Sequence, residues 1–227
     1  MGTISIIPAA DESALAMYAE GLAGVDTPAD ESDGPWFLRY DDGNRIMLEL
    51  ARWCADVLPG DDSLVERCVG PTLDVGCGPG RLAAAVRRRE LPVLGLDISP
   101  EAVRIARGRG ALVVQGSVFD ELPAEGTWTF VLLADGNVGI GGDPARLLRR
   151  CAEVMAADGQ LLVELDPPGT PSFAGPVWIE TATGRRSDSF PWAHLSLDGV
   201  EPVAAVAGLT VAECWTDSGR WFASLRK

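Results

Sequence analysis

Residues 73–82 read Leu73-Asp74-Val75-Gly76-Cys77-Gly78-Pro79-Gly80-Arg81-Leu82, and this stretch predicts the fold of the chain. A short apolar strand runs into an acidic residue, three glycines at alternate positions and the start of a helix. Glycines at such a turn let the backbone approach a ligand closely, and the helix start presents free N–H groups to it. The stretch therefore predicts a loop for a nucleotide-like cofactor; the alternative is a glycine-rich turn with a purely structural role.

The glycine spacing separates two kinds of cofactor. The dinucleotide fingerprint G-x-G-x-x-G would need a glycine at Arg81. The D-x-G-x-G-x-G arrangement instead resembles the first motif of the class I (Rossmann-like, seven-stranded) S-adenosylmethionine (SAM)-dependent methyltransferases. The carboxylate of Asp74 suits a cationic cofactor and would repel a pyrophosphate. The resemblance implies that the cofactor is SAM, with S-adenosylhomocysteine as product, and that it is contacted by Asp74, Gly76, Cys77, Gly78 and Gly80.

A second acidic residue follows at the spacing that a ribose-binding site requires. Residues 92–97 form a buried strand that ends in Asp97, 17 residues after Gly80 and close to the ~20 of dinucleotide-binding folds. Asp97 is therefore expected to accept hydrogen bonds from both ribose hydroxyls, with Ile98 beside it. Ser99 and Pro100 then open another helix as N-cap and first helical residue.

The resemblance also assigns an adenine-binding turn. A third short strand, residues 111–114, leads into residues 115–120. In the resembling family this turn flanks the adenine ring, often with an aspartate where Ser117 stands here. A serine can still accept a hydrogen bond from the exocyclic amine. The implied cofactor contacts are Ser117, Val118 and, after the fourth strand (residues 129–134), Ala134.

The remaining pattern continues an alternation of strands and helices. A helix is predicted from about residue 144 to 157 with Asp143 as N-cap and Asp158-Gly159 as its stop, followed by a strand over residues 160–165. A helix over about residues 200–208 precedes a hairpin of residues 209–215 and 220–225. This order matches an α/β, three-layer Rossmann-like methyltransferase fold, with a mostly parallel seven-stranded sheet and a C-terminal antiparallel hairpin.

Residues 71–227 are expected to form the SAM-binding domain. Two regions lie outside its core of alternating strands and helices, and the first is a substrate-side insertion over about residues 167–200. Residues 1–70 are expected to form a helical lid, with helices over residues 15–24 and 45–58 joined by an acidic connection over residues 26–43. Trp36 in this connection lines the substrate pocket or pins the lid to the sheet. The 14 acidic and 4 basic residues of this region form a solvated face or favour an amine substrate.

Composition excludes several classes of function. The net charge of −14 argues against nucleic acid as a partner. Lys227 is the only lysine, which excludes a Walker loop, a Schiff base and a pyridoxal phosphate site. No apolar run is long enough to cross a membrane, and five cysteines without a C-x-x-C pair suggest reduced thiols. We expect a cytoplasmic protein with neither a metal nor a membrane partner.

Two residues are candidates for acid–base chemistry. Asp135 follows the fourth strand, where ligands bind in α/β folds, and it either orients or deprotonates an acceptor or caps the glycine-rich turn. His194 is the only histidine, and it is either a base or a structural residue. Asn137 and Trp192 are expected to line the substrate pocket with Trp36.

The sequence thus predicts a SAM-dependent methyltransferase that transfers a methyl group in line to a small-molecule acceptor. Because the sulfonium makes the methyl carbon electrophilic, the protein mainly aligns the acceptor and excludes water. One alternative is a family member that binds SAM without methyl transfer. The other is an NAD-dependent oxidoreductase, whose Tyr-Lys pair is missing because Tyr18 and Tyr40 are the only tyrosines and no internal lysine exists.

Overall fold

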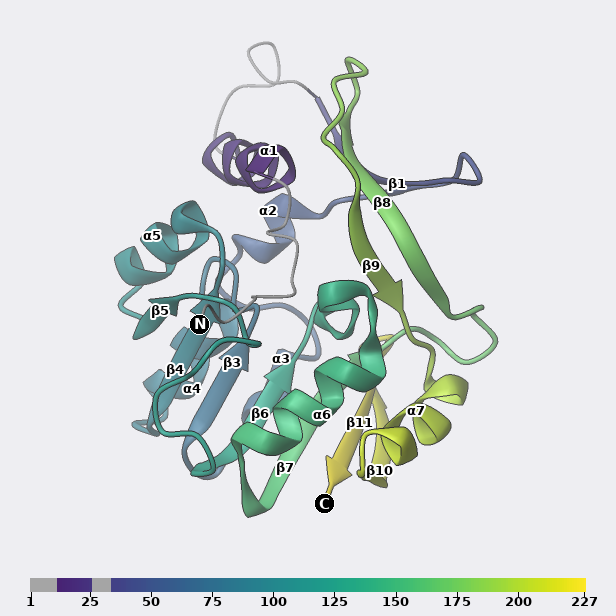
Figure 1. Cartoon of the computed structure of the whole chain (residues 1–227). Helices are drawn as coiled ribbons and strands as arrows, with labels where there is room; N and C mark the ends of the chain where they lie inside the picture. Colours follow the sequence, from purple (N-terminus) through teal and green to yellow (C-terminus); the bar gives the residue numbers. More distant parts are fainter. Residues whose placement is uncertain (1–11, 26–33) are drawn as a thin grey trace, which may run out of the picture.

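The computed structural model describes residues 12–25 and 34–227, and these residues form two β-sheets with helices around them (Figure 1). The larger sheet consists of β3 (Thr72–Val75), β4 (Val93–Asp97), β5 (Val113–Gln115), β6 (Trp128–Leu133), β7 (Met155–Leu165), β10 (Thr210–Asp217) and β11 (Arg220–Arg226). The smaller sheet consists of β1 (Trp36–Tyr40), β2 (Arg45–Met47), β8 (Phe173–Thr181) and β9 (Phe190–His194). The helices are α1 (Glu12–Ala23), α2 (Leu50–Trp53), α3 (Asp61–Val65), α4 (Arg81–Arg88), α5 (Pro100–Gly108), α6 (Pro144–Val154) and α7 (Val200–Val206), with 3-10 turns η1 (Asn137–Gly142) and η2 (Leu197–Gly199).

The seven-stranded sheet has the order β10-β11-β7-β6-β3-β4-β5. The strands from β7 to β5 are parallel, and β11 is antiparallel to β7 and to β10. The chain starts in the middle at β3, moves to β4 and β5, and then crosses back to β6 on the other side of β3. In such sheets ligands bind beyond the carboxyl ends of the strands where the order reverses, which here is between β3 and β6. The predicted fold class is confirmed.

Helices cover both faces of this sheet, which makes three layers (Figure 1). One buried cluster joins α6 and α7 to the sheet through Leu147, Leu148 and Val200. A second cluster joins α3, α4 and α5 to the opposite face through Leu64, Leu82 and Val103. Strand β6 supplies both, with Val131 and Leu133 on one face and Phe130 and Leu132 on the other. This explains the continuous apolar run in the sequence, because a central parallel strand is buried on both sides.

The smaller sheet stands above the carboxyl ends of the parallel strands (Figure 1). Its order is β2-β1-β8-β9, and all of its pairs are antiparallel. The register places Tyr40 opposite Val177, Val177 opposite Phe190, and Phe173 opposite His194, so these side chains share one face. Aromatic residues of this face pack together with Leu38 and Val177. The sheet unites the N-terminal region with the insertion after β7.

Two predictions of helices are wrong. No helix spans residues 45–58: β2 forms there, followed by the single turn α2. Helix α6 ends at Val154 rather than near residue 157, because Met155 is extended, buried and paired with Trp128. The predicted stop at Asp158-Gly159 therefore lies inside β7.

Other local predictions are confirmed. Ser99 caps α5 by accepting from the amide of Ala102, and Asp143 caps α6 by accepting from the amide of Arg146. The C-terminal hairpin forms with a two-residue turn between Asp217 and Arg220. The predicted acidic connection over residues 26–43 is wrong in its described part, because β1 forms there, and residues 26–33 lie outside the described residues. In the described part of the chain, no helix is both long and apolar enough to cross a membrane.

Candidate cofactor and acceptor site

The glycine loop between β3 and α4 is a tight left-handed turn. Gly76, Gly78 and Gly80 have φ values of 68°, 52° and 81°, a region that glycine enters without steric cost. A Cβ on Gly80 would lie 2.7 Å from the Cβ of Ala106, so this glycine lets the loop pack on α5. Cys77 turns its side chain inward against Gly95 of β4, where a small side chain fits. The backbone of the loop is thereby left facing the strand ends.

Asp74 is buried below the loop rather than directed across it. Its Oδ2 accepts a hydrogen bond of 3.1 Å from the amide of Ala83, in the first turn of α4. Burial raises the pKa of Asp74 to about 7, an effect that the nearby guanidinium of Arg81 opposes and the carboxylate of Asp135 reinforces. The carboxylate thus bonds an amide of the helix that supports the loop.

Asp97 lies at the carboxyl end of β4, beside the glycine loop. Its Oδ2 accepts from the amide of Gly78 and its Oδ1 accepts from the amide of Ser99, each at 2.8 Å. Burial raises the pKa of this carboxyl, although the three backbone hydrogen bonds that it receives counteract the shift. Each carboxylate oxygen has a further lone pair, so Asp97 can still accept two hydrogen bonds from a diol.

The residues assigned to the adenine surround the same strand ends. Ile98, directly after Asp97, is 41% exposed. The hydroxyl of Ser117 accepts from the amide of Phe119 and so holds its own turn, while Val118 is buried. The carbonyl of Ala134 accepts from the amide of Asn137.

Tyr18 of helix α1 reaches the loop, which the sequence did not predict. Its hydroxyl oxygen would lie 3.5 Å from a Cβ placed on Gly78. Burial, and then the negative charge of Asp97, raises the pKa of Tyr18 well above its usual value. The hydroxyl has no hydrogen-bond partner within the part of the chain that the structure describes. No local motif marks a tyrosine in an N-terminal helix, so only the packing of α1 on α5 reveals it.

A buried network of charges surrounds Asp135 and includes Arg81, the residue that directly follows the glycine loop. Asp135 forms ion pairs with Arg81 and with Arg220, the latter at 3.4 Å. Arg220 of β11 also pairs with Asp61 of α3 at 2.8 Å and with Glu164 of β7 at 2.7 Å, and Arg81 pairs with Asp61 as well. The network contains three carboxylates and two guanidinium groups. Burial raises the pKa of Asp135, a shift that Arg81 opposes.

Asn137, predicted to line the substrate pocket, holds the glycine loop. Its Nδ2 donates to the carbonyls of Val75 and Gly76, at 3.0 Å and 2.8 Å. Trp192 of β9 lies against η1, where a Cβ on Gly139 would meet its ring at 2.6 Å. Trp36 lies elsewhere, in the cluster of α1 and α2 with Leu50 and Ile179.

His194 ends β9 and bridges the two sheets. Its Nε2 lies 2.5 Å from the hydroxyl of Tyr40, and its Nδ1 lies 3.4 Å from Oδ2 of Asp166. Asp166 directly follows β7 and forms an isolated bridge with Ser196. The sequence analysis missed Tyr40 and Asp166; the one available signal was the position of Asp166 at the end of the fifth parallel strand.

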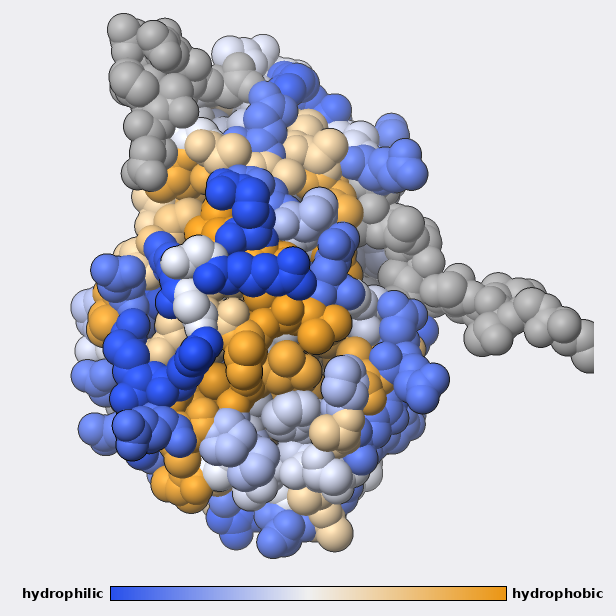
Figure 2. Space-filling model, turned by 90° about the vertical axis from the view of Figure 1, so that its left-hand side faces the viewer, coloured by the Kyte–Doolittle hydropathy of each residue, from blue (hydrophilic) through white to orange (hydrophobic). Residues whose placement is uncertain are grey.

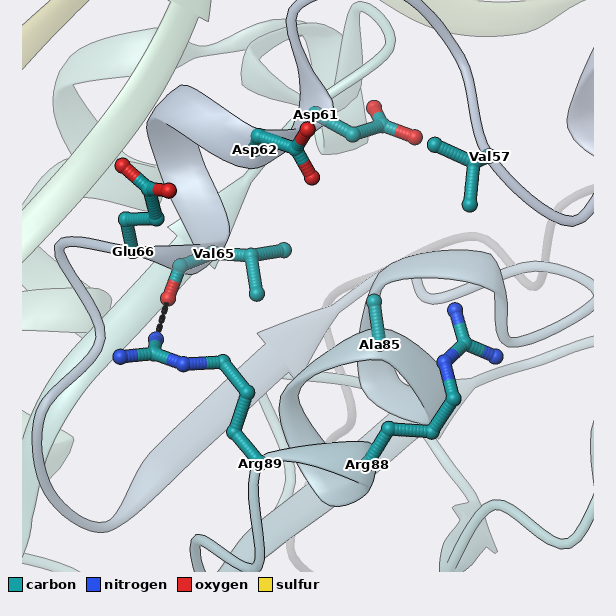
Figure 3. Close-up of a pocket in the computed structure, with 8 residues that line it drawn as sticks. All are labelled: Val57, Asp61, Asp62, Val65, Glu66, Ala85, Arg88 and Arg89. Carbon is teal, nitrogen blue, oxygen red and sulfur yellow. Dashed lines mark hydrogen bonds between the residues drawn. The ribbon is translucent and has the colours of Figure 1, made fainter.

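Two cavities among the described residues bear on the position of the site. The smaller, of about 60 Å³, lies between η1 and the ends of β7 and β9, and is lined by Gly136, Val138, Glu164, Leu165, Asp166, His194 and Leu195. The larger, of about 330 Å³, is an open hollow between α3 and α4, into which Arg88 and Arg89 extend and where Arg89 donates to the carbonyl of Val65 (Figure 3). The larger hollow is lined by none of the predicted site residues, whereas the smaller cavity is lined by one of them, His194.

The face of the molecule that carries α5 and β5 shows a band of apolar surface crossed by hydrophilic side chains (Figure 2).

Among the described residues, no group of three or more His, Cys, Asp or Glu side chains is arranged to hold a metal ion. All five cysteines are free thiols. The site is therefore a glycine loop, a strand-end carboxylate and a small polar cavity at the point where the strand order reverses.

This fold and loop define a class I methyltransferase architecture, and comparisons with known proteins agree. Residues 72–159 match a family model described as "Methyltransferase domain". A SAM-dependent methyltransferase from Bacteroides fragilis, solved with S-adenosyl-L-homocysteine, superposes with a TM-score of 0.73 at 20% identity and covers 97% of each chain.

Two curated relatives cover part of the chain. Trans-aconitate 2-methyltransferase of Mycobacterium sp. (strain KMS) is 35% identical over 128 residues, which are 56% of this chain and 47% of the relative. Ribosomal protein L11 methyltransferase of Agrobacterium fabrum is 35% identical over 118 residues, 51% of this chain and 38% of the relative. The chain thus spans about half the length or less of these relatives. Residues 72–159 are thus similar to a methyltransferase domain, and the chain has the fold of a SAM-dependent methyltransferase, as its motifs predicted.

Proposed function

We propose that this protein transfers the methyl group of SAM to a small-molecule acceptor. The observation that carries the proposal is the junction of Asp97 with the glycine loop at the reversal point of the sheet. There a carboxylate with free acceptor capacity lies 2.8 Å from the amide of Gly78, and both belong to the loops where this fold binds its cofactor.

The residues around the loop fit SAM. Asp97 would accept the ribose hydroxyls, Ile98 would cover one side of the adenine, and the turn of Ser117 and Val118 would flank its edge. The backbone of residues 76–80 would follow the methionine part, and the hydroxyl of Tyr18 offers a donor or acceptor over Gly78. The ion-pair network has one carboxylate in excess, which favours a cofactor that carries ammonium and sulfonium charges. When bound, SAM supplies an electrophilic methyl carbon.

The acceptor is proposed to enter below the smaller sheet. That sheet covers the strand ends, and its aromatic inner face, with the cavity of about 60 Å³, provides an enclosed rather than a flat surface. Such enclosure excludes water from the reacting atoms, which methyl transfer requires. The ribosomal relative suggests a protein acceptor as the second candidate, but an enclosed site favours a small molecule.

Of the two candidates for proton removal, the geometry favours His194. Both carboxylate oxygens of Asp135 face guanidinium groups, whereas His194 lines the cavity. Asp135 is proposed to hold the ion-pair network next to the methyl group. Asn137 would keep the loop in its ligand-binding form, and Trp192 would line the acceptor side.

The first test is calorimetric binding of SAM, S-adenosylhomocysteine and NADH to the purified protein. Micromolar binding of the SAM pair without NADH binding is expected, and preferential NADH binding would refute the proposal. The second test separates methyl transfer from binding alone: SAM with a labelled methyl group is incubated with the small-molecule and macromolecular fractions of a cell lysate. Label is expected in the small-molecule fraction. Label only in protein would favour the second candidate, and binding without any transfer would identify a SAM-binding protein that is not an enzyme.

A further inference from the structure

His194 stands in a hydrogen-bonded chain that joins both sheets. Tyr40 comes from the end of β1, His194 from the end of β9 and Asp166 from the residue after β7. The contacts are 2.5 Å from the phenol oxygen to Nε2 and 3.4 Å from Nδ1 to the carboxylate. Since the chain has no other histidine, this is the one place where an imidazole can act.

The direction of the hydrogen bonds follows from the chemistry of the two outer residues. Burial and the charge of Asp166 raise the pKa of Tyr40 to about 12, so the phenol keeps its proton at neutral pH. A phenol donates to an unprotonated ring nitrogen, which leaves the ring proton on Nδ1, facing the carboxylate of Asp166. The tautomer fixed in this way places the basic lone pair of the imidazole on the side of Tyr40.

His194 and Asp166 line the smaller cavity, and this cavity is acidic. Of its seven lining residues, Glu164 and Asp166 carry carboxylates and none is Arg or Lys. Glu164 is paired with Arg220, whereas among the described residues the carboxylate of Asp166 has no Arg or Lys partner and contacts only the neutral ring of His194. A carboxylate in a partly buried cavity without a cation attracts a positively charged group and repels an anion.

We propose that the acceptor is a protonated amine and that Tyr40, His194 and Asp166 together remove its proton; this inference rests on the proposed function. One ammonium proton passes to the oxygen of Tyr40 as the phenol proton moves to Nε2 of His194. The imidazolium that forms donates to Asp166 through Nδ1. The freed nitrogen lone pair then forms a bond to the methyl carbon of SAM, and the pair of the breaking C–S bond stays on sulfur. The products are the methylated ammonium ion, S-adenosylhomocysteine and one proton released from His194 to solvent.

The relay needs both aromatic partners. Because the pKa of Tyr40 is raised to about 12, a free phenolate does not form at neutral pH. Tyr40 therefore gives its proton to His194 in the same step in which it receives one from the ammonium group. Asp166 is a positioning residue for the tautomer and also the negative charge that receives the acceptor. A carboxylate acceptor such as that named for the trans-aconitate relative would meet the wrong charge here.

The only histidine makes a direct test possible. In protein with isotope-labelled histidine, a long-range proton–nitrogen correlation spectrum assigns the ring proton to one nitrogen without ambiguity. At neutral pH we expect it on Nδ1 in the wild type and a mixture of tautomers in Tyr40→Phe and in Asp166→Asn. Asp198→Asn, which changes a neighbouring carboxylate that bonds the amide of Gly169, is the matched control and should keep the wild-type pattern. A proton on Nε2 in the wild type would overturn the relay.

The acceptor class is tested with three probes that share one ring: benzylamine, benzyl alcohol and benzoate. Each is titrated into protein saturated with S-adenosylhomocysteine, and the ring signals of His194 are followed. Benzylamine is expected to bind about tenfold more tightly than benzoate, as one favourable charge interaction would give, and Asp166→Asn should remove this preference. Equal or tighter binding of benzoate, or a histidine signal that no probe moves, would contradict the amine assignment. Failure of S-adenosylhomocysteine to bind would instead refute the proposed function, and the tautomer measurement on the free protein would still stand.

Discussion

The carboxylate of Asp97 accepts a hydrogen bond of 2.8 Å from the amide of Gly78, which ties the end of the second parallel strand to the glycine loop of the first. The same carboxylate accepts from the amide of Ser99 at the start of α5. One side chain therefore sets the relative position of three segments that would contact the cofactor. The loop is held in shape before a ligand arrives, which reduces the ordering that binding would require.

Asp97→Ala is expected to weaken binding of S-adenosylhomocysteine about 100-fold, or about 2.7 kcal/mol, because two hydrogen bonds from the ribose to a charged acceptor are lost. Calorimetric titration measures the change. Glu101→Ala is the control, since Glu101 pairs with Arg104 on the exposed side of α5. Wild-type affinity in Asp97→Ala would mean that the cofactor does not use this carboxylate.

Tyr18→Phe is expected to weaken binding of S-adenosylhomocysteine about fivefold to tenfold, the value of one hydrogen bond. Its hydroxyl faces Gly78 and has no partner among the described residues, so a bound cofactor would supply the first one. Tyr40→Phe should leave this affinity unchanged, because the hydroxyl of Tyr40 is already bonded to His194. The two variants remove the same atom from the only two tyrosines of the chain. Equal affinities in wild type and Tyr18→Phe would remove Tyr18 from the site.

The part of the site that could be predicted from the sequence is the part encoded locally. The turns after β3 and β4 depend on glycines and a carboxylate within a few residues of each strand, so Gly76, Gly78, Gly80 and Asp97 could be placed from spacing alone. Ser99 and Asp143 could be identified as caps for the same reason. These features need no knowledge of distant segments.

The second sheet could not be predicted, because its central pair of strands, β1 and β8, lies more than 130 residues apart in the sequence. Trp36 of β1 pairs with Thr181 of β8, and a five-residue strand gives too short an alternation to be recognised. The same reason hid Tyr40, whose role depends on His194. Residues 155–159 misled the prediction of α6 because their backbone conformation is decided by pairing with Trp128 in β6 rather than by their helix propensity.

Gly80→Ala is expected to lower the free energy of unfolding by about 2–4 kcal/mol, through backbone strain at φ 81° and a clash with Ala106. Gly110→Ala is the matched control, because Gly110 has φ 79° but a Cβ placed on it would meet no atom within 4 Å. It should cost only the strain, about 1 kcal/mol. Urea unfolding measures both. Equal losses would show that the contact with α5 contributes nothing.

Arg220→Met is expected to destabilise the protein by about 3–5 kcal/mol, because it removes the guanidinium that pairs with Glu164 and leaves the buried carboxylate of Asp61 with Arg81 alone. Arg226→Met, an exposed position on the same strand, should change the stability by less than about 0.5 kcal/mol. Chemical unfolding at neutral pH gives both values. A small effect of Arg220→Met would mean that water or rearrangement compensates the network, and its proposed role beside the cofactor would lose its basis.

The raised pKa of Asp74 predicts that its contribution to the free energy of unfolding falls as the pH rises, which is the opposite of the usual behaviour of a carboxyl group. Its pKa is about 7 in the folded protein, mainly because of burial, against about 3.9 in an unfolded chain. The folded state therefore binds this proton more tightly, so the contribution of Asp74 to stability is complete below pH about 4 and declines as the pH rises to about 7. Asp61, whose pKa is lowered, has the opposite sign but loses its contribution only below its unfolded value.

The measurement compares wild type with Asp74→Asn by urea unfolding at several pH values between about 5 and 8. The comparison cancels Asp97 and Asp135, whose raised pKa values act in the same direction in both proteins. Relative to the variant, the wild type should lose up to about 1.4 kcal/mol per pH unit over the lower part of this range, and the difference should level off above pH about 7. Asparagine keeps an oxygen for the amide of Ala83, so the variant should fold and retain its helix cap. A stability difference that stays constant from pH 5 to 8 would mean that Asp74 is ionised throughout, and that Arg81 outweighs the cost of its burial.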